Sequence, residues 1–509
     1  MNGAMTGSHI LTALTFLPLV GAAIALFSGR HARGVALITA LIALAGSLWV
    51  WTLLPADGSI GLVQRIPWAP SIGIEYHLGV DALGALMLVL SAIVTLMAVD
   101  AAHRVHHQPG LFYALILVLQ TGLFGSFTAL NFFHWFIYWE VSLIPAFFLI
   151  KLWGGARRGP AATQFFIYTM AGSVALLVCF LALFLSTGTM DFTDLAALTA
   201  SGELARLVTA HLGPVMMWLA AGVLAGFAVK VPMIPFHTWL PAAYAEAPSP
   251  VTMLLTGAMS KMGVYGLLRI ALPIFGPQIY AMRTPLLVLA VITVVMGAWA
   301  AAAQKDLKRI FAYSSVNHLG YCLLAIFALA VPAAGVAAQT NQASALNGVI
   351  LQMFNHGLTA AALFWFVAII QLRTGGDRGL HDFGGLRKPA PVLAGLMGIA
   401  MFSSLGLPGL NSFVSEFLIF RGVFPLNWVA ASISVLGLLI TAAVLLNIIQ
   451  KVFSGPVPEH LKEFPDLHHS EKLALAPVIG LMILIGIVPQ LILNSVNPTV
   501  VNLLAHWRF

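Results

Sequence analysis

Residues 221–241 read AGVLAGFAVKVPMIPFHTWLP, an apolar stretch that holds one lysine and two prolines. About twenty apolar residues cross the hydrocarbon core of a bilayer, so this stretch has the composition of a membrane-spanning helix. A lysine at mid-bilayer costs roughly 2.5–3.5 kcal/mol on insertion scales, and such residues face the protein interior. Pro232 and Pro235 disrupt the helix directly after Lys230. The stretch therefore predicts a membrane protein with a charged and broken span.

The rest of the chain has the same membrane composition. Of its 509 residues, 60% are hydrophobic and 8% are charged, whereas a soluble domain has about 25% charged residues. Hydropathy predicts an all-α polytopic membrane protein without a soluble domain. We expect about fourteen transmembrane helices, near residues 9–28, 35–54, 78–100, 111–130, 132–150, 162–187, 212–234, 247–272, 284–303, 309–331, 345–372, 391–420, 427–450 and 472–494.

Lysine and arginine collect in the loops that follow the odd-numbered spans, among them Arg30, Arg104, Lys151, Lys308, Arg378 and Lys462. The positive-inside rule places these loops in the cytoplasm. We therefore expect a multi-pass protein of the bacterial inner membrane with both termini in the periplasm. The net charge of +7 reflects these loops and does not indicate a nucleic-acid partner.

Four charged residues lie inside predicted spans, namely Glu140, Lys230, Lys261 and Glu416. Each could be a structural ion pair or a snorkelling side chain. Two carboxylates and two ammonium groups could also form neutral pairs, which lowers the cost of their burial. Breaking and making one such pair loads and releases a proton. The sequence thus predicts proton transfer at mid-membrane depth.

Three histidines add possible steps, because imidazole exchanges protons near neutral pH. His318 and His356 lie inside predicted spans, and His237 follows Lys230 by seven residues, or two turns of an unbroken helix. A lone buried histidine is more often structural. The alternative from another class is a membrane cytochrome in which His318 and His356 ligate haem, but the buried lysines then have no role.

A second break is predicted where Pro408 and Gly409 precede Glu416. The breaks fall in helices 7 and 12, five helices apart, and paired breaks of this kind mark the ion pathway of transporters with internal repeats. We expect two inverted five-helix repeats. The predicted segments are 1–110 (helices 1–3), 111–272 (helices 4–8), 273–453 (helices 9–13) and 454–509 (helix 14).

The chain has no G-x-G-x-x-G, Walker or C-x-x-C motif, and its two cysteines lie in apolar runs. We therefore expect it to bind no nicotinamide, flavin, nucleotide, iron–sulfur cluster or other metal. Any redox chemistry must lie in other subunits.

Long motifs carry a resemblance to a known family: KVPMIPFHTWLP, EAPSPVTMLLTGAMSKMGVYGLLR, QKDLKRIFAYSSVNHLGY and SLGLPGLNSFVSEFLIF. Together they resemble the antiporter-like membrane subunits of respiratory complex I, over the stretch from Asp81 to Asp466. The resemblance is strongest to the chain M type of NADH-quinone oxidoreductase, the counterpart of mitochondrial chain 4.

The resemblance implies fourteen helices, two inverted repeats and broken helices 7 and 12. It also implies that Glu140 pairs with Lys230 and that Lys261 is the central lysine. His318 and His356 then lie between Lys261 and an exit residue, which is a lysine in sister chains and a glutamate in chain M. Here that residue is Glu416. His237 matches the histidine after the first break.

By the same resemblance, this chain is a non-redox subunit of a proton-translocating NADH:quinone oxidoreductase. Its expected partners are the other membrane-arm subunits, including sister antiporter-like chains. Flavin, iron–sulfur clusters and quinone are expected in partner subunits only.

The chain departs from the family at two places. The family often reads W-L-P-D-A-H where this chain has Ala242 and Tyr244, and it often has lysine where this chain has Gln164. The rival assignments are a Mrp-type cation/proton antiporter, a membrane hydrogenase and an ion-driven inorganic-carbon uptake complex.

Overall fold

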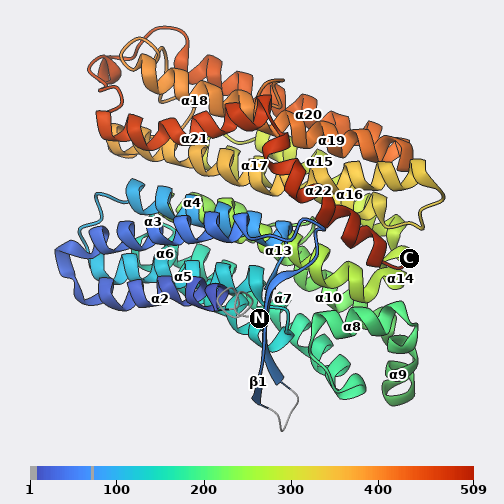
Figure 1. Cartoon of the computed structure of the whole chain (residues 1–509). Coiled ribbons are helices and arrows are strands. Elements are labelled where there is room, and N and C mark those ends of the chain that lie inside the picture. The colour runs from blue at the N-terminus through green and yellow to red at the C-terminus, as the bar shows by residue number, and fades with distance from the viewer. Residues whose placement is uncertain (1–8, 70–73) are drawn as a thin grey trace.

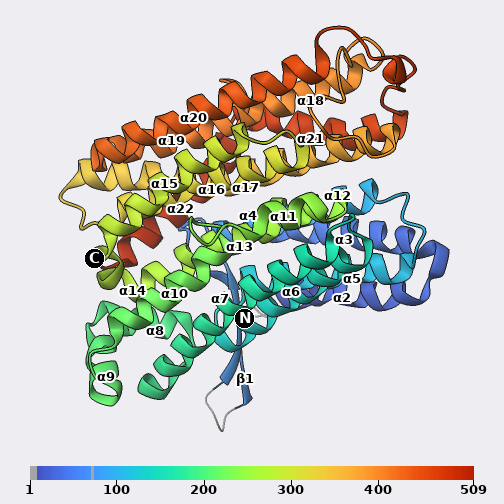
Figure 2. The same cartoon turned by 180° about the vertical axis from the view of Figure 1, so that it is seen from behind.

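The computed structural model describes residues 9–69 and 74–509. Long helices lie roughly side by side, with the N-terminal half (blue to green) in one layer and the C-terminal half (yellow to red) in the other (Figures 1 and 2). Within the described part of the chain, twelve helices are long and apolar enough to cross a membrane. The prediction of a polytopic helical membrane protein is confirmed.

Most predicted spans correspond to one element or one unbroken run of elements. These are α2 (Ile10–Phe27), α3 (Ala32–Thr52), α4 (Ala82–Ala101), α5 (Pro109–Thr128), α6 (Phe132–Trp153), α7 (Arg158–Thr187), α15 (Arg283–Ala302), α16 (Leu307–Leu329), α17 (Val336–Thr374), α20 (Trp428–Ile448) with η5 (Ile449–Phe453), and α21 (His469–Ile487). The span predicted at 247–272 is the run α12 (Ser249–Leu254), η3 (Leu255–Met259), α13 (Lys261–Gly266), η4 (Leu267–Ala271) and α14 (Leu272–Ala281).

Two predicted spans meet a break in the helix. Predicted helix 7, at 212–234, is α10 (Met216–Lys230) and ends in the break; the short helix α11 (Trp239–Glu246) follows beyond the predicted end. Predicted helix 12 consists of α18 (Pro391–Ser404) and α19 (Asn411–Leu426). The breaks therefore lie where the prolines predicted them. Backbone groups inside a membrane need partners. In the first break the N–H of Ile234 donates to Thr293 Oγ1 at 3.0 Å. In the second break the N–H of Leu407 donates to the Phe402 carbonyl at 3.0 Å.

Several elements were not predicted. An antiparallel hairpin of β1 (Gly61–Ala69) and β2 (Ile74–Val80) makes the fold mostly rather than wholly helical. Two further helices, α8 (Phe192–Ala200) and α9 (Glu203–Leu212), precede α10. The predicted last span was too long: α21 stops at Ile487 and a separate helix α22 (Gln490–His506) follows, because Pro489 intervenes. The two short helices η1 (Gly29–His31) and η6 (Glu459–Leu461) lie in loops.

The loops meet at the two ends of the bundle. At one end the Trp153 indole donates to the His107 carbonyl, and Arg378 binds Asp306 at 2.6 Å. We call this the basic end, since it gathers the loops that the sequence places in the cytoplasm. The other end, here the hairpin end, holds the contact of Arg65 with Asp194 at 3.1 Å.

Burial separates central helices from peripheral ones. The hydrophobic window is fully buried in the run from α12 to α14 and 94% buried in α16 and α17, but only 39% buried in α7. Peripheral helices expose large apolar side chains such as Leu185 and Trp299, as helices in contact with lipid do. Lys261, His318 and His356 all lie on the central helices.

Two glycines allow central helices to touch. A methyl group built on Gly357 of α17 would lie 2.5 Å from the carbonyl oxygen of Gly257 in η3 and 2.7 Å from Leu90 of α4. Only hydrogen at this position permits that approach. Because His356 precedes Gly357, the same contact sets the position of His356 against Lys261.

Gly357→Val is expected to lower the stability of the chain by about 1–3 kcal/mol, since overpacking a close contact has this cost. The midpoint of thermal unfolding of the detergent-purified complex measures it. The matched control is Gly480→Val in α21, where no neighbour lies within 4 Å of the added carbon. Equal melting temperatures for the two variants would contradict the close approach.

Candidate functional site

The ammonium group of Lys261 lies fully inside the protein and has three polar neighbours. It donates to the backbone carbonyl of Thr256 at 2.5 Å, to Ser260 Oγ at 3.3 Å and to His356 Nδ1 at 2.8 Å. Lys261 follows the π-helical turn η3, which carries the Thr256 carbonyl. When lysine is charged, Nδ1 of His356 must accept, so the remaining imidazole proton sits on Nε2. The pair is therefore arranged for transfer from nitrogen to nitrogen.

His318 continues the buried series toward the second break. Its ring lies 5.2 Å, centroid to centroid, from the ring of His356. Its Nδ1 contacts Glu416 Oε1 at 3.1 Å, and its Nε2 contacts Ser404 Oγ at 3.1 Å. His318, His356 and Glu416 are each at most 5% exposed. The contact thus joins a ring nitrogen and a carboxylate oxygen directly, away from water.

The second break brings Glu416 to His318. Ser404 ends α18, and Glu416 lies in α19. Gly406, with φ +81°, lies in the break, and a methyl group there would lie 2.7 Å from the Glu416 carboxylate. Buried side chains join the two half-helices and α17 through hydrogen bonds; they are Gln352, Asn355, Thr359, Ser403, Asn411 and Ser415. We call Lys261, His356, His318 and Glu416 the buried relay.

Glu140 and Lys230 do not form the direct ion pair that the resemblance implies. Lys230 is 3% exposed, and its ammonium lies 4.6 Å from the centre of the Trp139 ring. Among the described residues no carboxylate lies within 4.0 Å of it, and Glu140 Oε1 is buried without a hydrogen-bond partner. The indole face attracts the cation. Lys230 also ends α10, where the helix dipole favours positive charge.

Close helix packing places Lys230 beside the helix of Lys261. A methyl group on Gly263 would lie 2.5 Å from Val231 and 3.2 Å from Lys230 Cβ. His237 lies in the break and not two helical turns beyond Lys230, because the helix ends at Lys230. The His237 ring is 6.3 Å from that of Tyr313 on α16. The side chains of Lys230 and His237 thus lie near the central helices but do not contact the buried relay directly.

Lys308 was placed in a surface loop by the sequence, and this placement is wrong. The side chain is 3% exposed, and its ammonium donates to the Ala247 carbonyl at 2.6 Å. Asp306 accepts from the Arg309 N–H at 3.2 Å and caps α16, so the helix begins before Lys308. Aspartate is a common helix N-cap, and its place just before an apolar run could have shown that the helix begins at Leu307 and includes Lys308.

The geometry disfavours the haem alternative. Both ring nitrogens of His318 already have protein partners, and one nitrogen of His356 faces an ammonium group. An axial ligand needs a free ring nitrogen. Within the described ranges, no cluster of three or more His, Cys, Asp or Glu side chains is arranged to hold a metal ion.

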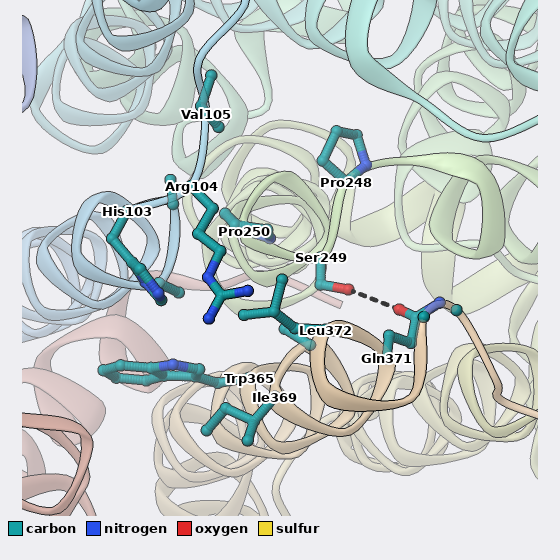
Figure 3. Close-up of a pocket in the computed structure, with 15 residues that line it drawn as sticks. His103, Arg104, Val105, Pro248, Ser249, Pro250, Trp365, Ile369, Gln371 and Leu372 are labelled. Carbon is teal, nitrogen blue, oxygen red and sulfur yellow. Dashed lines mark hydrogen bonds between the residues drawn. The ribbon is translucent and has the colours of Figure 1, made fainter. Parts of the chain in front are cut away.

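A cavity of about 450 Å³ opens at the basic end beside the start of α12 (Figure 3). Pro248, Ser249 and Pro250 lie on one side of it and Trp365 on another, and Ser249 Oγ donates to Gln371 Oε1 at 3.3 Å. None of the predicted site residues lines this cavity. It brings open space up to the joint between α11 and α12.

Comparison with known proteins identifies the family of the chain. Residues 129–441 match the family described as NADH:quinone oxidoreductase/Mrp antiporter, transmembrane. The chain belongs to this family. The matched region contains Glu140, both breaks and the whole buried relay.

Members of the family are similar to the chain over almost its full length. NADH-quinone oxidoreductase subunit M of Rickettsia typhi is 32% identical over 97% of this chain and 98% of the relative. Subunit M of Rhodobacter capsulatus is 33% identical over 98% and 97%, and NAD(P)H-quinone oxidoreductase chain 4 1 of Nostoc is 34% identical over 98% and 91%.

Solved structures of family members have the same fold. A chain of respiratory complex I from Thermus thermophilus with bound NADH is 26% identical, with a TM-score of 0.85 over 98% of this chain and 100% of that chain. A chain of the Mrp complex from Dietzia is 22% identical, with a TM-score of 0.83 over 97% of both chains. The Mrp likeness concerns the fold alone.

Proposed function

We propose that this chain is the subunit M-type membrane-arm subunit of a bacterial NADH:quinone oxidoreductase and moves protons along the buried relay. The observation that carries the proposal is the buried series from Lys261 through His356 and His318 to Glu416. The full-length relatives named subunit M support the complex I assignment over the Mrp-type rival. Electron transfer from NADH to quinone, with its flavin and iron–sulfur clusters, belongs to partner subunits.

The steps follow from the contacts. Lys261 passes a proton from its ammonium group to His356 Nδ1, and the neutral amine is left behind. His356 then releases the proton from Nε2 toward His318, where the Glu416 carboxylate stabilises the imidazolium. Glu416 accepts the proton and gives it up on the far side. Each step needs only groups that can be neutral or charged inside a protein.

Glu140 and Lys230 form the controlling half of the proposed mechanism. Their open arrangement supports a pair that makes and breaks contact, because the buried Lys230 ammonium and one buried oxygen of the half-buried Glu140 lack a direct partner among the residues described. When the carboxylate approaches Lys230, it holds the lysine proton; when it withdraws, the proton is released. His237 in the first break is proposed to exchange protons with this pair.

The orientation and repeats remain part of the proposal. Basic residues at the basic end support its placement in the cytoplasm, with both termini in the periplasm. The breaks between α10 and α11 and between α18 and α19 support inverted repeats at 111–272 and 273–453, flanked by segments 1–110 and 454–509. The proposed partners are sister antiporter-like chains and other membrane-arm subunits.

Lys230→Ala and Glu140→Ala are each expected to lower proton pumping about tenfold or more, because positioned proton-transfer groups contribute at least that much to rate. Proton uptake into vesicles that contain the purified complex and oxidise NADH measures it. Assembly should be affected far less, and gel analysis of the complex measures this.

The control is Lys388→Ala, which removes an exposed lysine in a loop. Full pumping in both the Lys230 and Glu140 variants would defeat the assignment. A requirement for sodium would favour the Mrp-type rival, since sodium prefers clustered oxygen ligands.

A further inference from the structure

We infer that Lys261 is loaded with protons from the basic end by a direct route through Lys308, a row of hydroxyl groups and Tyr244. This route does not pass through Lys230. The inference rests on the proposed function of Lys261 and identifies residues that supply its proton.

The route starts at Lys308. Its buried ammonium has one hydrogen-bond acceptor among the described residues, the Ala247 carbonyl at the joint of α11 and α12. Arg378, which binds Asp306 at 2.6 Å and lies 3.7 Å from Glu246, joins the surrounding loops at the basic end. A buried lysine with no carboxylate within 4.0 Å can lose its proton, unlike an arginine. Lys308 thus stands between the charged loops and the interior.

A row of hydroxyl groups leads inward from that joint. Thr252, Thr256 and Ser260 are spaced four residues apart, so they lie on one face of the run from α12 to Lys261. Thr252 Oγ1 is 3.5 Å from the Ala247 carbonyl that binds Lys308, and Ser260 Oγ is 3.3 Å from the Lys261 ammonium. All three are buried. These contacts place one end of the row near Lys308 and the other end at Lys261.

Ser315 of α16 adds a fourth hydroxyl beside the row, because its Oγ lies 3.0 Å from Thr256 Oγ1. Structural hydroxyls bond the preceding turn of their own helix, as Ser260 does with the Thr256 carbonyl. Thr256 instead points its hydroxyl between two helices, toward a second hydroxyl.

Tyr244 completes the route. It is fully buried on α11, and its hydroxyl faces the side chains of Ser260 and Thr256. It makes no hydrogen bond of full geometry with any described residue, but it lies near enough to Ser260 and Thr256 to interact with both. The Tyr244 backbone carbonyl accepts from Thr252 Oγ1 at 3.0 Å. The position of the hydroxyl beside Ser260 makes it a transfer group for the lysine.

The chemistry of the step balances without any other reactant than water. The Lys308 ammonium gives a proton to a water molecule, that water passes one proton to the Tyr244 oxygen, and the original hydroxyl proton leaves toward the neutral amine of Lys261. Tyrosine is uncharged before and after. The neutral Lys308 amine then takes a proton from water at the basic end, and the net result is one proton moved from that water to Lys261.

The test uses Tyr244→Phe, Tyr244→His and Lys308→Gln in the complete complex in vesicles. Phenylalanine keeps the ring and removes only the hydroxyl, so a packing role predicts no change. The route predicts a fall in pumping of about tenfold, with recovery in Tyr244→His, because imidazole also transfers protons. Lys308→Gln keeps a donor for the Ala247 carbonyl but carries no proton, and it should lower pumping to a similar extent.

The matched control is Tyr113→Phe, which also removes a buried tyrosine hydroxyl, here one that donates to the Ala102 carbonyl at 2.8 Å. Normal pumping in Tyr244→Phe and Lys308→Gln, together with loss in Lys261→Met, would overturn this route and leave the proposed function intact. Normal pumping in Lys261→Met would instead defeat the proposed function. A Tyr244→His variant as defective as Tyr244→Phe would also overturn the route.

Discussion

Lys261→Met is expected to lower proton pumping about 100-fold while the complex still assembles. Methionine has nearly the shape of lysine, but it carries no proton, and a removed proton-transfer group costs about 10²–10⁴ in rate. Proton uptake during NADH oxidation in vesicles measures the loss. Stability should change little, because a buried charge replaced by an apolar side chain of similar volume is often neutral or stabilising.

Lys261→Arg separates charge from proton transfer. Guanidinium stays charged and cannot release its proton, so pumping should be lost although the positive charge remains. The control is Lys151→Met, which changes an exposed lysine at the end of α6. If Lys261→Arg pumped normally, the lysine would act only as a fixed charge, and the proton-transfer role would be wrong.

Glu416→Gln should have the second largest effect, again about 100-fold on pumping. Glutamine keeps the size of the side chain and can still accept from His318 Nδ1, which lies 3.1 Å from the carboxylate. It cannot take up the proton, and it removes the negative charge that stabilises the imidazolium. Glu416→Asp retains the acid and should recover part of the activity.

Proton uptake by the reconstituted complex again provides the measurement. Glu463→Gln is the matched control, since Glu463 is exposed in a loop at the basic end. Equal activity of the Glu416→Gln and Glu463→Gln variants would remove Glu416 from the relay. Loss of assembly in Glu416→Gln would be checked against Glu416→Asp, which preserves the contact with His318.

The sequence by itself determined that the protein lies in a membrane and which charged residues lie inside its spans. Hydropathy shows that Lys230, Lys261, Glu140 and Glu416 lie inside spans, because a charge within an apolar run stands out against its neighbours. The prolines after Lys230 and before Glu416 located both breaks, because proline disrupts a helix wherever the helix packs. Local rules also failed in places: the hairpin and α22 were missed, and Lys308 was read as a loop residue.

Only the tertiary structure decided which groups touch. Lys261 and His356 are 95 residues apart in the chain, and His318 and Glu416 are 98 apart. Their contacts depend on how whole helices approach, as at Gly257 and Gly357, and periodicity within one helix carries no information about that approach. The same packing buried Lys308 and set Lys230 over Trp139 instead of against Glu140. Sequence thus fixes the depth of each charge, whereas helix packing fixes its partner.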